Sequence, residues 1–275
     1  MTEGVNHIKS RKKKWLRIIK VSAVAYLAIG VAVYHLQEKF MFHPKALDAN
    51  EAFSFSEPHQ EVNIPVDAAT TYNLVQFTTP VKPKGVVLYF HGNMENVNHY
   101  SGAANTFTSK GYEIWMIDYP TFGKSTGALT EEAMYEQALQ VYKMSRSRFS
   151  PSEIIIYGRS MGSGVAAQLA SIRDCKRLIL ETPYYSLPSL ASRFFWMYPL
   201  EEMIRFKMPT NQYLTKVSAP VTIFHGTEDG VIPYSHAQQL KQVLKPSDEF
   251  VTIVGGSHND LSKFPTLQIR LNNLL

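Results

Sequence analysis

Cysteine is almost missing from this chain of 275 residues, because Cys175 is the only one. A single thiol excludes a disulfide within the chain and a cysteine-rich metal site. An excess of charge is also missing from most of the sequence. Residues 1–20 hold seven of the 28 Lys and Arg and one of the 23 Asp and Glu, which leaves 21 basic and 22 acidic residues in 21–275. The basic excess therefore belongs to the N-terminal arm, and nothing in the remainder favours nucleic-acid binding.

A long apolar run follows this arm. Residues 21–36 read VSAVAYLAIGVAVYHL, and with Trp15 and its apolar neighbours the stretch is long enough to cross a bilayer. We predict a basic arm over 1–14 and a transmembrane anchor over 15–36. The excess of Lys and Arg before the run places the N-terminus in the cytoplasm and the main domain on the opposite side. A cleaved signal peptide has the same pattern and is the alternative.

The rest of the chain alternates between strands and helices. After a connector over 37–58, with apolar Phe40 and Phe42, we predict a strand pair over 59–66 and 71–80. Continuous apolar strands then alternate with helices, which is typical of a parallel sheet covered on both faces. The expected strands cover 85–90, 112–119, 154–157, 177–180, 221–224 and 250–254, and the expected helices cover 97–110, 130–148, 165–173, 234–244 and 261–275. We therefore predict one α/β domain over 59–275.

The motif G-x-S-x-G lies between a predicted strand and a predicted helix. Residues 153–164 read EIIIYGRSMGSG, with Ser160 at the centre. A nucleophile on so tight a turn needs small neighbours, which explains Gly158 and Gly162. The turn also puts the Ser160 hydroxyl at a helix N-terminus, where negative charge is favoured. A tight turn with an unreactive serine is the alternative.

A serine nucleophile needs a base and a carboxylate that orients the base. Asp229 follows the strand over 221–224, and His258 follows the strand over 250–254. The carboxyl ends of parallel strands meet at one edge of the sheet, so we expect Ser160, Asp229 and His258 to meet there. The chain order Ser, Asp, His also fits this arrangement. Glu228 is the rival carboxylate.

Two other histidines, His91 and His225, also end strands. Each precedes a glycine and has no carboxylate signal, so we interpret both as structural.

The oxyanion that forms during attack by Ser160 needs two N–H donors. The backbone N–H of Met161, directly after the nucleophile, is one. The loop after the strand over 85–90 supplies the other, and Asn93 is our choice, with Met94 as an alternative.

An aromatic-rich insertion interrupts the alternation. Residues 183–213 lie between two predicted strands and are rich in Phe, Tyr, Met and Trp. The segment is too long for a simple connection and too apolar for a solvated loop. We predict a small cap over the site; a longer helix and loop packed on the domain is the alternative.

From about Phe40 onward the chain resembles serine hydrolases of the α/β-hydrolase superfamily, in the branch of membrane-anchored members. The motifs that carry the resemblance are HGN at 91–93, GRSMGSG at 158–164, HGTEDGVIP at 225–233 and GGSHND at 255–260. The resemblance implies the α/β-hydrolase fold and hydrolysis of esters or thioesters, with lipids or acylated proteins among the substrates of relatives. Such relatives usually continue HGN with a small residue and Gly, where this chain has Met94 and Glu95. They often carry Gly where this chain has Thr121.

These observations predict a serine hydrolase that needs no metal or cofactor, with a lipid or other small acyl compound as substrate. Ser160 attacks the acyl carbonyl, His258 takes its proton, and Asp229 orients His258. A peptidase or an acyltransferase of the same fold would use the same residues. A non-catalytic, membrane-anchored binding protein is the alternative from another class. The sequence sets neither the acyl chain length nor the oligomeric state.

Overall fold

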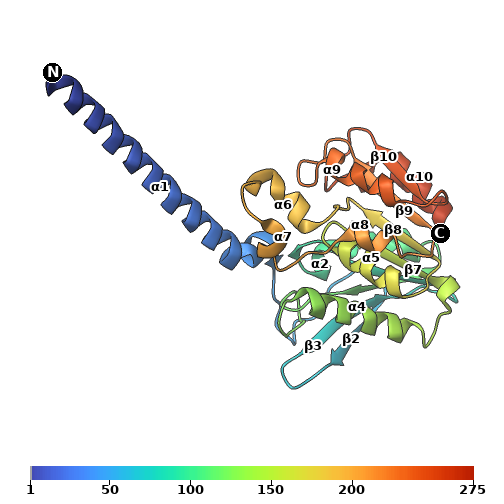
Figure 1. Ribbon diagram of the computed structural model, residues 1–275. Helices are drawn as coiled ribbons and strands as arrows, with labels where there is room; N and C mark the ends of the chain where they lie inside the picture. Colours follow the sequence, from blue (N-terminus) through green and yellow to red (C-terminus); the bar gives the residue numbers. More distant parts are fainter. Residues whose placement is uncertain (1) are drawn as a thin grey trace.

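The computed structural model describes residues 2–275, with side chains described from Lys12 onward. Helix α1 (Thr2–Met41) projects from an α/β domain as one long rod (Figure 1). Of the arm expected over 1–14, Met1 lies outside the described residues, and the rest belongs to α1. The helix also continues past the expected end of the span at Leu36. An 18-residue window within Lys12–Met41 has a mean hydropathy of 1.9 and is not buried against the domain, so α1 is long and apolar enough to cross a membrane.

An eight-stranded sheet forms the centre of the domain. Its first two strands in chain order lie at one edge and run antiparallel to their neighbours, and the other pairs are parallel. Across the sheet the strands are β2 (His59–Pro65), β3 (Thr71–Phe77), β6 (Tyr112–Ile117), β4 (Gly85–Phe90), β7 (Ile154–Arg159), β8 (Arg177–Glu181), β9 (Val221–Gly226) and β10 (Glu249–Ile253). The central parallel strands are buried on both faces, as their continuous apolar runs predict.

Two apolar cores lie on the two faces of this sheet. In β4, Val86 and Leu88 face one core, and Val87 and Tyr89 face the other. The first core is covered by α4 (Glu131–Ser145), α5 (Gly162–Ile172) and α8 (Thr210–Leu214), and the second by α2 (Val97–Tyr100), α3 (Ala104–Thr108) and α10 (Pro265–Leu274). This alternation of strand side chains fixes the sheet between two layers of helices.

Three helices that the sequence predicts as continuous are divided. The segment 97–110 forms α2, a 3₁₀ turn over Ser101–Ala103 and α3. Ser101 and Gly102 are weak helix formers, which explains the interruption. The final segment divides at Pro265, which occupies the first position of α10, where proline is favoured. The segment 234–244 forms α9 (Tyr234–Gln238) and a 3₁₀ turn over Gln239–Val243.

The connector after α1 is docked on the domain. Strand β1 (His43–Pro44) pairs in parallel with β5 (Met94–Glu95), which lies directly after Asn93. Phe42 is buried, and its ring lies 4.6 Å from that of Phe206. The apolar part of the connector therefore contacts the domain.

The insertion over 183–213, which we continue to call the cap, contains helices α6 (Leu187–Phe195) and α7 (Leu200–Met203), followed by α8. A separate apolar cluster joins the cap to α1. Tyr198, Leu200 and Ile204 form its centre, and Val33 of α1 packs against them. In Figure 1 the cap helices α6 and α7 lie beside the end of α1 that enters the domain. The cap therefore contacts the N-terminal helix as well as the domain.

Thr121 has a strained backbone. Its φ is +73°, in the left-handed region that a β-branched residue rarely adopts. The strain costs on the order of 1–3 kcal/mol, and glycine relieves it while losing about 0.4–1 kcal/mol through greater freedom in the unfolded chain. We therefore expect Thr121→Gly to raise the free energy of unfolding by about 1 kcal/mol and Tm by about 2–4 °C. Thr121→Ala is the control, because alanine keeps the Cβ atom and should give little change. Equal Tm values for the two variants would contradict the strain.

Candidate active site

Ser160 lies on a tight turn between β7 and α5. Its φ is +52°, which is strained for a residue with a side chain. A Cβ atom added at Gly158 would lie 2.5 Å from the Gly162 carbonyl oxygen, and one added at Gly162 would lie 2.1 Å from the Phe90 carbonyl oxygen. Both positions therefore require glycine, as the motif predicts. The backbone N–H of Ser160 donates to the Glu181 carbonyl at 2.8 Å, which ties the turn to β8.

The structure brings the three predicted residues together at the carboxyl ends of the strands. The Oγ atom of Ser160 lies 2.9 Å from Nε2 of His258, and Nδ1 of His258 lies 2.8 Å from Oδ2 of Asp229. All three residues are largely shielded from solvent. The imidazole thus bridges the hydroxyl and the carboxylate, which is the geometry that proton transfer from a serine nucleophile requires.

Asp229 rather than Glu228 faces His258. The backbone N–H groups of Val231 and Ile232 donate to Oδ1 of Asp229 at 2.9 and 2.8 Å, which leaves Oδ2 for the histidine. Burial raises the pKa of Asp229, but the hydrogen bonds from His258 and Ile232 outweigh it, and the net pKa lies below its usual value. Asp229 is therefore ionised at neutral pH. Glu228 is exposed to solvent.

The two predicted oxyanion donors flank Ser160. Met161 begins the helix that follows the nucleophile, and a Cβ atom at Gly92, the neighbour of Asn93, would lie 3.6 Å from Cβ of Ser160. Within the described part of the chain, neither the Met161 nor the Asn93 amide N–H donates to a protein group. The Asn93 side chain is engaged elsewhere, because its Nδ2 donates to the Met41 carbonyl at 2.6 Å. The backbone N–H of Asn93 therefore remains as the candidate donor.

His91 and His225 are each beside a carboxylate, which corrects the sequence interpretation in part. Nε2 of His91 lies 3.3 Å from Oδ1 of Asp118, and Nε2 of His225 lies 3.6 Å from Oδ2 of Asp229. Nδ1 of each histidine contacts the carbonyl oxygen of the following glycine. The carboxylates escaped the sequence analysis because Asp118 is distant in sequence and Asp229 was already assigned to His258.

A charged network that the sequence analysis missed supports the nucleophile turn. Arg159 precedes Ser160, and its Nη2 donates to Oδ1 of Asn259, the residue after His258, at 3.2 Å. Its Nε lies 3.4 Å from Oε1 of Glu181, which also accepts a hydrogen bond from Tyr157. Arg159 thus links the loop of the nucleophile to the loop of the histidine. The sequence signal was present, since Arg159 and Asn259 are direct neighbours of the predicted residues.

His236 makes the stability of the fold depend on pH. Burial lowers its pKa to about 4, with smaller contributions from Arg193 and His225. Its Nε2 accepts a hydrogen bond from the Tyr185 N–H at 3.3 Å, which requires the neutral imidazole. An unfolded histidine titrates near 6.5, so between about pH 6.5 and pH 4 the unfolded chain binds the proton that folded His236 excludes.

We therefore expect Tm to fall as the pH is lowered through this window, and to fall less in His236→Gln. Burial also lowers the pKa of His225, so part of the pH dependence should remain. Thermal unfolding between pH 7 and pH 4.5 measures this. His99→Gln is the control, because the His99 side chain is 44% exposed. A His236→Gln variant with the same loss of Tm as the parent would contradict the assignment.

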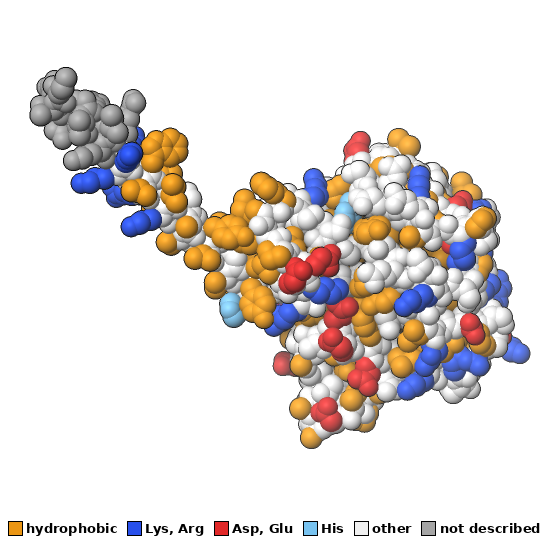
Figure 2. All heavy atoms as spheres, in the orientation of Figure 1, with side chains coloured by type: hydrophobic (Ala, Val, Ile, Leu, Met, Phe, Trp, Pro, Cys, Tyr) orange, Lys and Arg blue, Asp and Glu red, His pale blue; other side chains and the backbone are white. Residues whose placement is uncertain are grey.

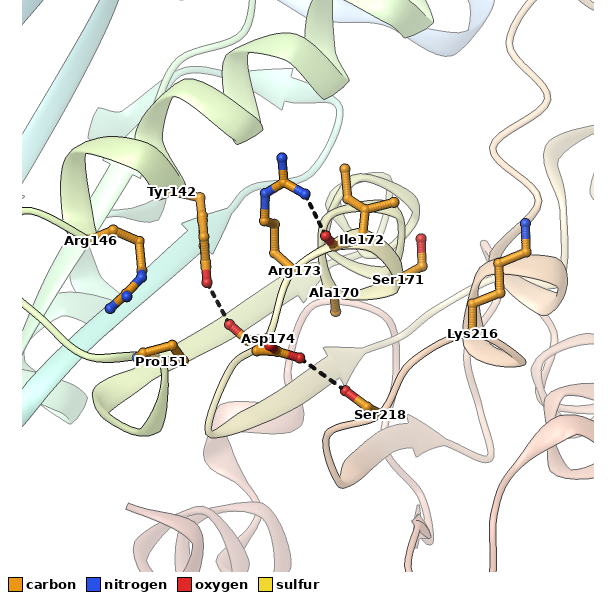
Figure 3. A pocket seen from close by; sticks show the side chains of 10 residues that line it. All are labelled: Tyr142, Arg146, Pro151, Ala170, Ser171, Ile172, Arg173, Asp174, Lys216 and Ser218. Carbon is orange, nitrogen blue, oxygen red and sulfur yellow. Dashed lines mark hydrogen bonds between the residues drawn. The ribbon is translucent and has the colours of Figure 1, made fainter.

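In the described part of the chain, no group of three or more His, Cys, Asp or Glu side chains is placed to hold a metal ion. A groove of about 560 Å³ lies away from the triad, at the end of the sheet where β7, β8 and β9 begin (Figure 3). Asp174 in this groove accepts a hydrogen bond from Tyr142 through its carbonyl oxygen. The groove contains none of the predicted site residues, so it is separate from the candidate active site.

Comparison with known proteins finds hydrolases among those similar to this chain. A profile of the family described as serine aminopeptidase, S33, matches residues 81–201. Human protein ABHD12B is 26% identical over 225 residues, which cover 69% of this chain and 60% of that protein. Mouse alpha/beta hydrolase domain-containing protein 17C is 26% identical over 254 residues, which cover 90% of this chain and 74% of that protein. The match thus spans less than two thirds of the length of ABHD12B.

Solved structures share the architecture. The esterase Pf2001 of Pyrococcus furiosus superposes with a TM-score of 0.66 at 18% identity, covering 86% of this chain and 97% of that chain. Est1E of Butyrivibrio proteoclasticus, with ferulic acid bound, superposes with a TM-score of 0.61 at 18% identity, covering 77% and 95% of the two chains. These similarities confirm the predicted α/β-hydrolase fold.

The sheet, the turn at Ser160 and these relatives define the class: the chain has the α/β-hydrolase fold, and its sequence is similar to members of that superfamily. Its relatives support a hydrolase within that superfamily, and α1 provides the long apolar helix that the membrane-anchored branch requires.

Proposed function

We propose that this chain is a membrane-anchored serine hydrolase that cleaves carboxylic ester or thioester bonds. The observation that carries the proposal is the chain of contacts from Ser160 through His258 to Asp229, at 2.9 and 2.8 Å. The esterase neighbours support the ester chemistry by analogy of fold.

The mechanism follows from this geometry. Ser160 Oγ attacks the acyl carbon while its proton moves to Nε2 of His258, and Asp229 stabilises the imidazolium. The N–H groups of Met161 and Asn93 bind the oxyanion. The leaving group then takes the proton from His258, which leaves an acyl group on Ser160. Water gives a proton to His258, attacks the acyl carbon and releases the acid, and Ser160 regains its proton.

The proposed substrates carry an apolar acyl group, as in a lipid, a lysophospholipid or an acylated protein. Two features support this choice. The cap over 183–213 is apolar, and its base contacts the nucleophile turn, because the Tyr184 hydroxyl donates to the Met161 carbonyl at 3.0 Å. The long apolar helix α1 would hold the site near a lipid surface.

We propose that α1 is retained as the anchor, with its N-terminus in the cytoplasm and the hydrolase domain on the opposite side. Lys12, Lys13 and Lys14 at the start of the span support this orientation. Contacts with the cap support retention over cleavage. The side chain of Gln37 accepts a hydrogen bond from the Arg205 N–H at 2.6 Å and donates to the Met203 carbonyl at 3.1 Å. Removal of α1 would leave the Arg205 N–H and the Met203 carbonyl without the Gln37 side chain as their hydrogen-bond partner.

One assay series on the full chain in detergent tests the reaction. We expect a fluorophosphonate probe to label the protein and p-nitrophenyl esters of increasing acyl chain length to be hydrolysed. The dependence of the rate on acyl chain length then measures the size of the acyl pocket. Aminoacyl p-nitroanilides test the aminopeptidase activity that the name of the family profile suggests. An added alcohol tests acyl transfer. A folded protein that neither reacts with the probe nor turns over any substrate would contradict the proposal and favour a binding protein.

A further inference from the structure

The end of α6 and the turn that joins it to α7 expose large apolar side chains. We call residues 194–199 the cap tip. Phe194 is 73% exposed, Trp196 is 76% exposed and Met197 is 49% exposed. Three large exposed apolar side chains within four consecutive residues are costly in water and indicate an interaction surface.

The cap tip is fixed against the middle of α1. The rings of Tyr26 and Tyr198 stack with their centroids 4.6 Å apart and an interplanar angle of 10°. The Tyr198 hydroxyl donates to the Tyr26 carbonyl at 2.7 Å, and the Tyr26 hydroxyl donates to the Met197 carbonyl at 3.1 Å. A Cβ atom at Gly30 would lie 3.0 Å from Cε1 of Tyr198, so glycine allows the close approach.

The contact reaches far along the predicted span. A second contact joins Glu38 of α1 to Arg205 at 3.1 Å. Tyr26 and Glu38 are about 18 Å apart along the helix at about 1.5 Å per residue. If Trp15 and Tyr34 mark the two membrane interfaces, Tyr26 lies about 12 Å inside the one near the domain. A cap tip that contacts Tyr26 must then lie within the same leaflet.

The apolar and the acidic residues of the cap lie at different levels along α1. The apolar cap tip lies level with Tyr26 and Gly30, whereas the exposed Glu201 and Glu202 belong to α7, which packs near Val33 and Gln37. The acidic side chains are thus nearer the domain than the aromatic ones, as a boundary between water and lipid requires. Figure 2 shows apolar side chains along α1 continuing onto the adjacent part of the domain, with acidic side chains gathered next to them.

Arg193 lies next to the cap tip and is compatible with this placement. Its guanidinium lies 5.7 Å from the centre of the Phe194 ring. A long basic side chain can extend its charge to the headgroups while its stem stays in the apolar region.

An apolar groove of about 310 Å³ lies between α1 and the cap. Its lining includes Leu27 and Val31 of α1 and Tyr198 and Pro199 of the cap tip. Leu27 and Val31 are themselves 65% and 59% exposed, so the groove opens onto the apolar surface of the helix. The groove thus makes one continuous apolar surface of α1 and the cap tip.

We propose that the cap tip inserts into the acyl-chain region of a phospholipid leaflet beside α1, so that the protein is attached to the membrane at two points. The continuity of the surface with the span favours lipid as the occupant. This inference rests on the proposed membrane anchor and is independent of the proposed catalysis. Amphipathic helices at an interface bury their apolar face by about 5–10 Å, so the depth of about 12 Å derived above is slightly greater.

Tryptophan fluorescence of the full chain in phosphatidylcholine vesicles tests this placement. The chain has three tryptophans, Trp15, Trp115 and Trp196, and Trp115 is buried in the core of the domain. In W15F, the lipid-sensitive emission comes from Trp196. The emission of Trp196 is the difference in fluorescence between W15F and W15F/W196F. We expect vesicles with brominated acyl chains to quench most of this emission.

A matched control places tryptophan at another exposed apolar position. Val254 is 80% exposed and follows β10, away from the cap. We expect V254W in the W15F/W196F background to escape quenching by the bromine atoms.

Three results would overturn the inference. If Trp15 is quenched in W196F but Trp196 in W15F is not, the anchor is supported and the cap tip lies outside the lipid. If neither is quenched, the anchor proposal fails together with this inference. If bromine does not quench Trp196, and Trp196 becomes shielded from water only as the protein concentration in the vesicles rises, a second copy of the chain covers the cap tip.

Discussion

Ser160→Ala is expected to abolish both fluorophosphonate labelling and ester turnover. The variant loses the hydroxyl that contacts His258 at 2.9 Å, and no acyl-enzyme can form. Loss of a triad member lowers kcat by about 10⁴-fold or more in serine hydrolases. Hydrolysis of a p-nitrophenyl ester at saturating substrate measures the loss. Near-ultraviolet circular dichroism checks that the variant retains its fold.

Ser171→Ala is the matched control for this variant. Ser171 lies on the same helix, α5, and its hydroxyl donates to the Gln168 carbonyl at 2.7 Å, away from the triad. We expect turnover and labelling of Ser171→Ala to equal those of the parent. If Ser160→Ala retained its labelling, another residue would be the nucleophile, and the assignment of Ser160 would be wrong.

Asp229→Asn is expected to lower kcat by about 10⁴-fold with little effect on KM. The backbone N–H groups of Val231 and Ile232 hold Oδ1, so an asparagine keeps its carbonyl there and presents its NH₂ group to Nδ1 of His258. The histidine then carries its proton on Nε2, which faces Ser160 and can no longer accept the serine proton. Steady-state kinetics with a p-nitrophenyl ester separates kcat from KM.

Glu228→Gln provides the comparison that decides between the two adjacent carboxylates. Glu228 is exposed, so its charge is screened by solvent. We expect its kcat to stay within about twofold of the parent, because an exposed charge contributes little. A large loss in Glu228→Gln together with a small one in Asp229→Asn would reverse the assignment of the acid.

The sheet and the triad are predictable because their signals are local. Each strand is a short apolar run that ends in a glycine or a polar residue, and each reactive side chain follows such an end. Parallel strands bring these ends to one edge, so three separate local patterns give one site. The distances around His258 agree with that reasoning.

The contacts between distant segments are not predictable from such patterns. Tyr26 and Tyr198 are both aromatic residues in apolar stretches, and nothing in the chain links them before folding places α1 beside the cap. The two-residue strand β1 is too short to show any periodicity. Arg159 and Glu181 meet because β7 and β8 are neighbours in the sheet, which depends on strand order.

Because β1 pairs with β5, the effect of cutting the chain between α1 and the domain depends on the position of the cut. The His43 N–H donates to the Asn93 carbonyl at 2.8 Å, and the Lys45 N–H donates to the Glu95 carbonyl at 3.0 Å, so this strand holds the loop that contains Asn93, the proposed second oxyanion donor. Proteolysis after Lys39 would shed a domain with the strand intact, whereas proteolysis after Lys45 would shed one without it. We expect a form that begins at Phe40 to hydrolyse p-nitrophenyl esters faster than one that begins at Ala46, and equal rates would contradict this role. The site of cleavage would then decide whether shedding releases an enzyme or inactivates it.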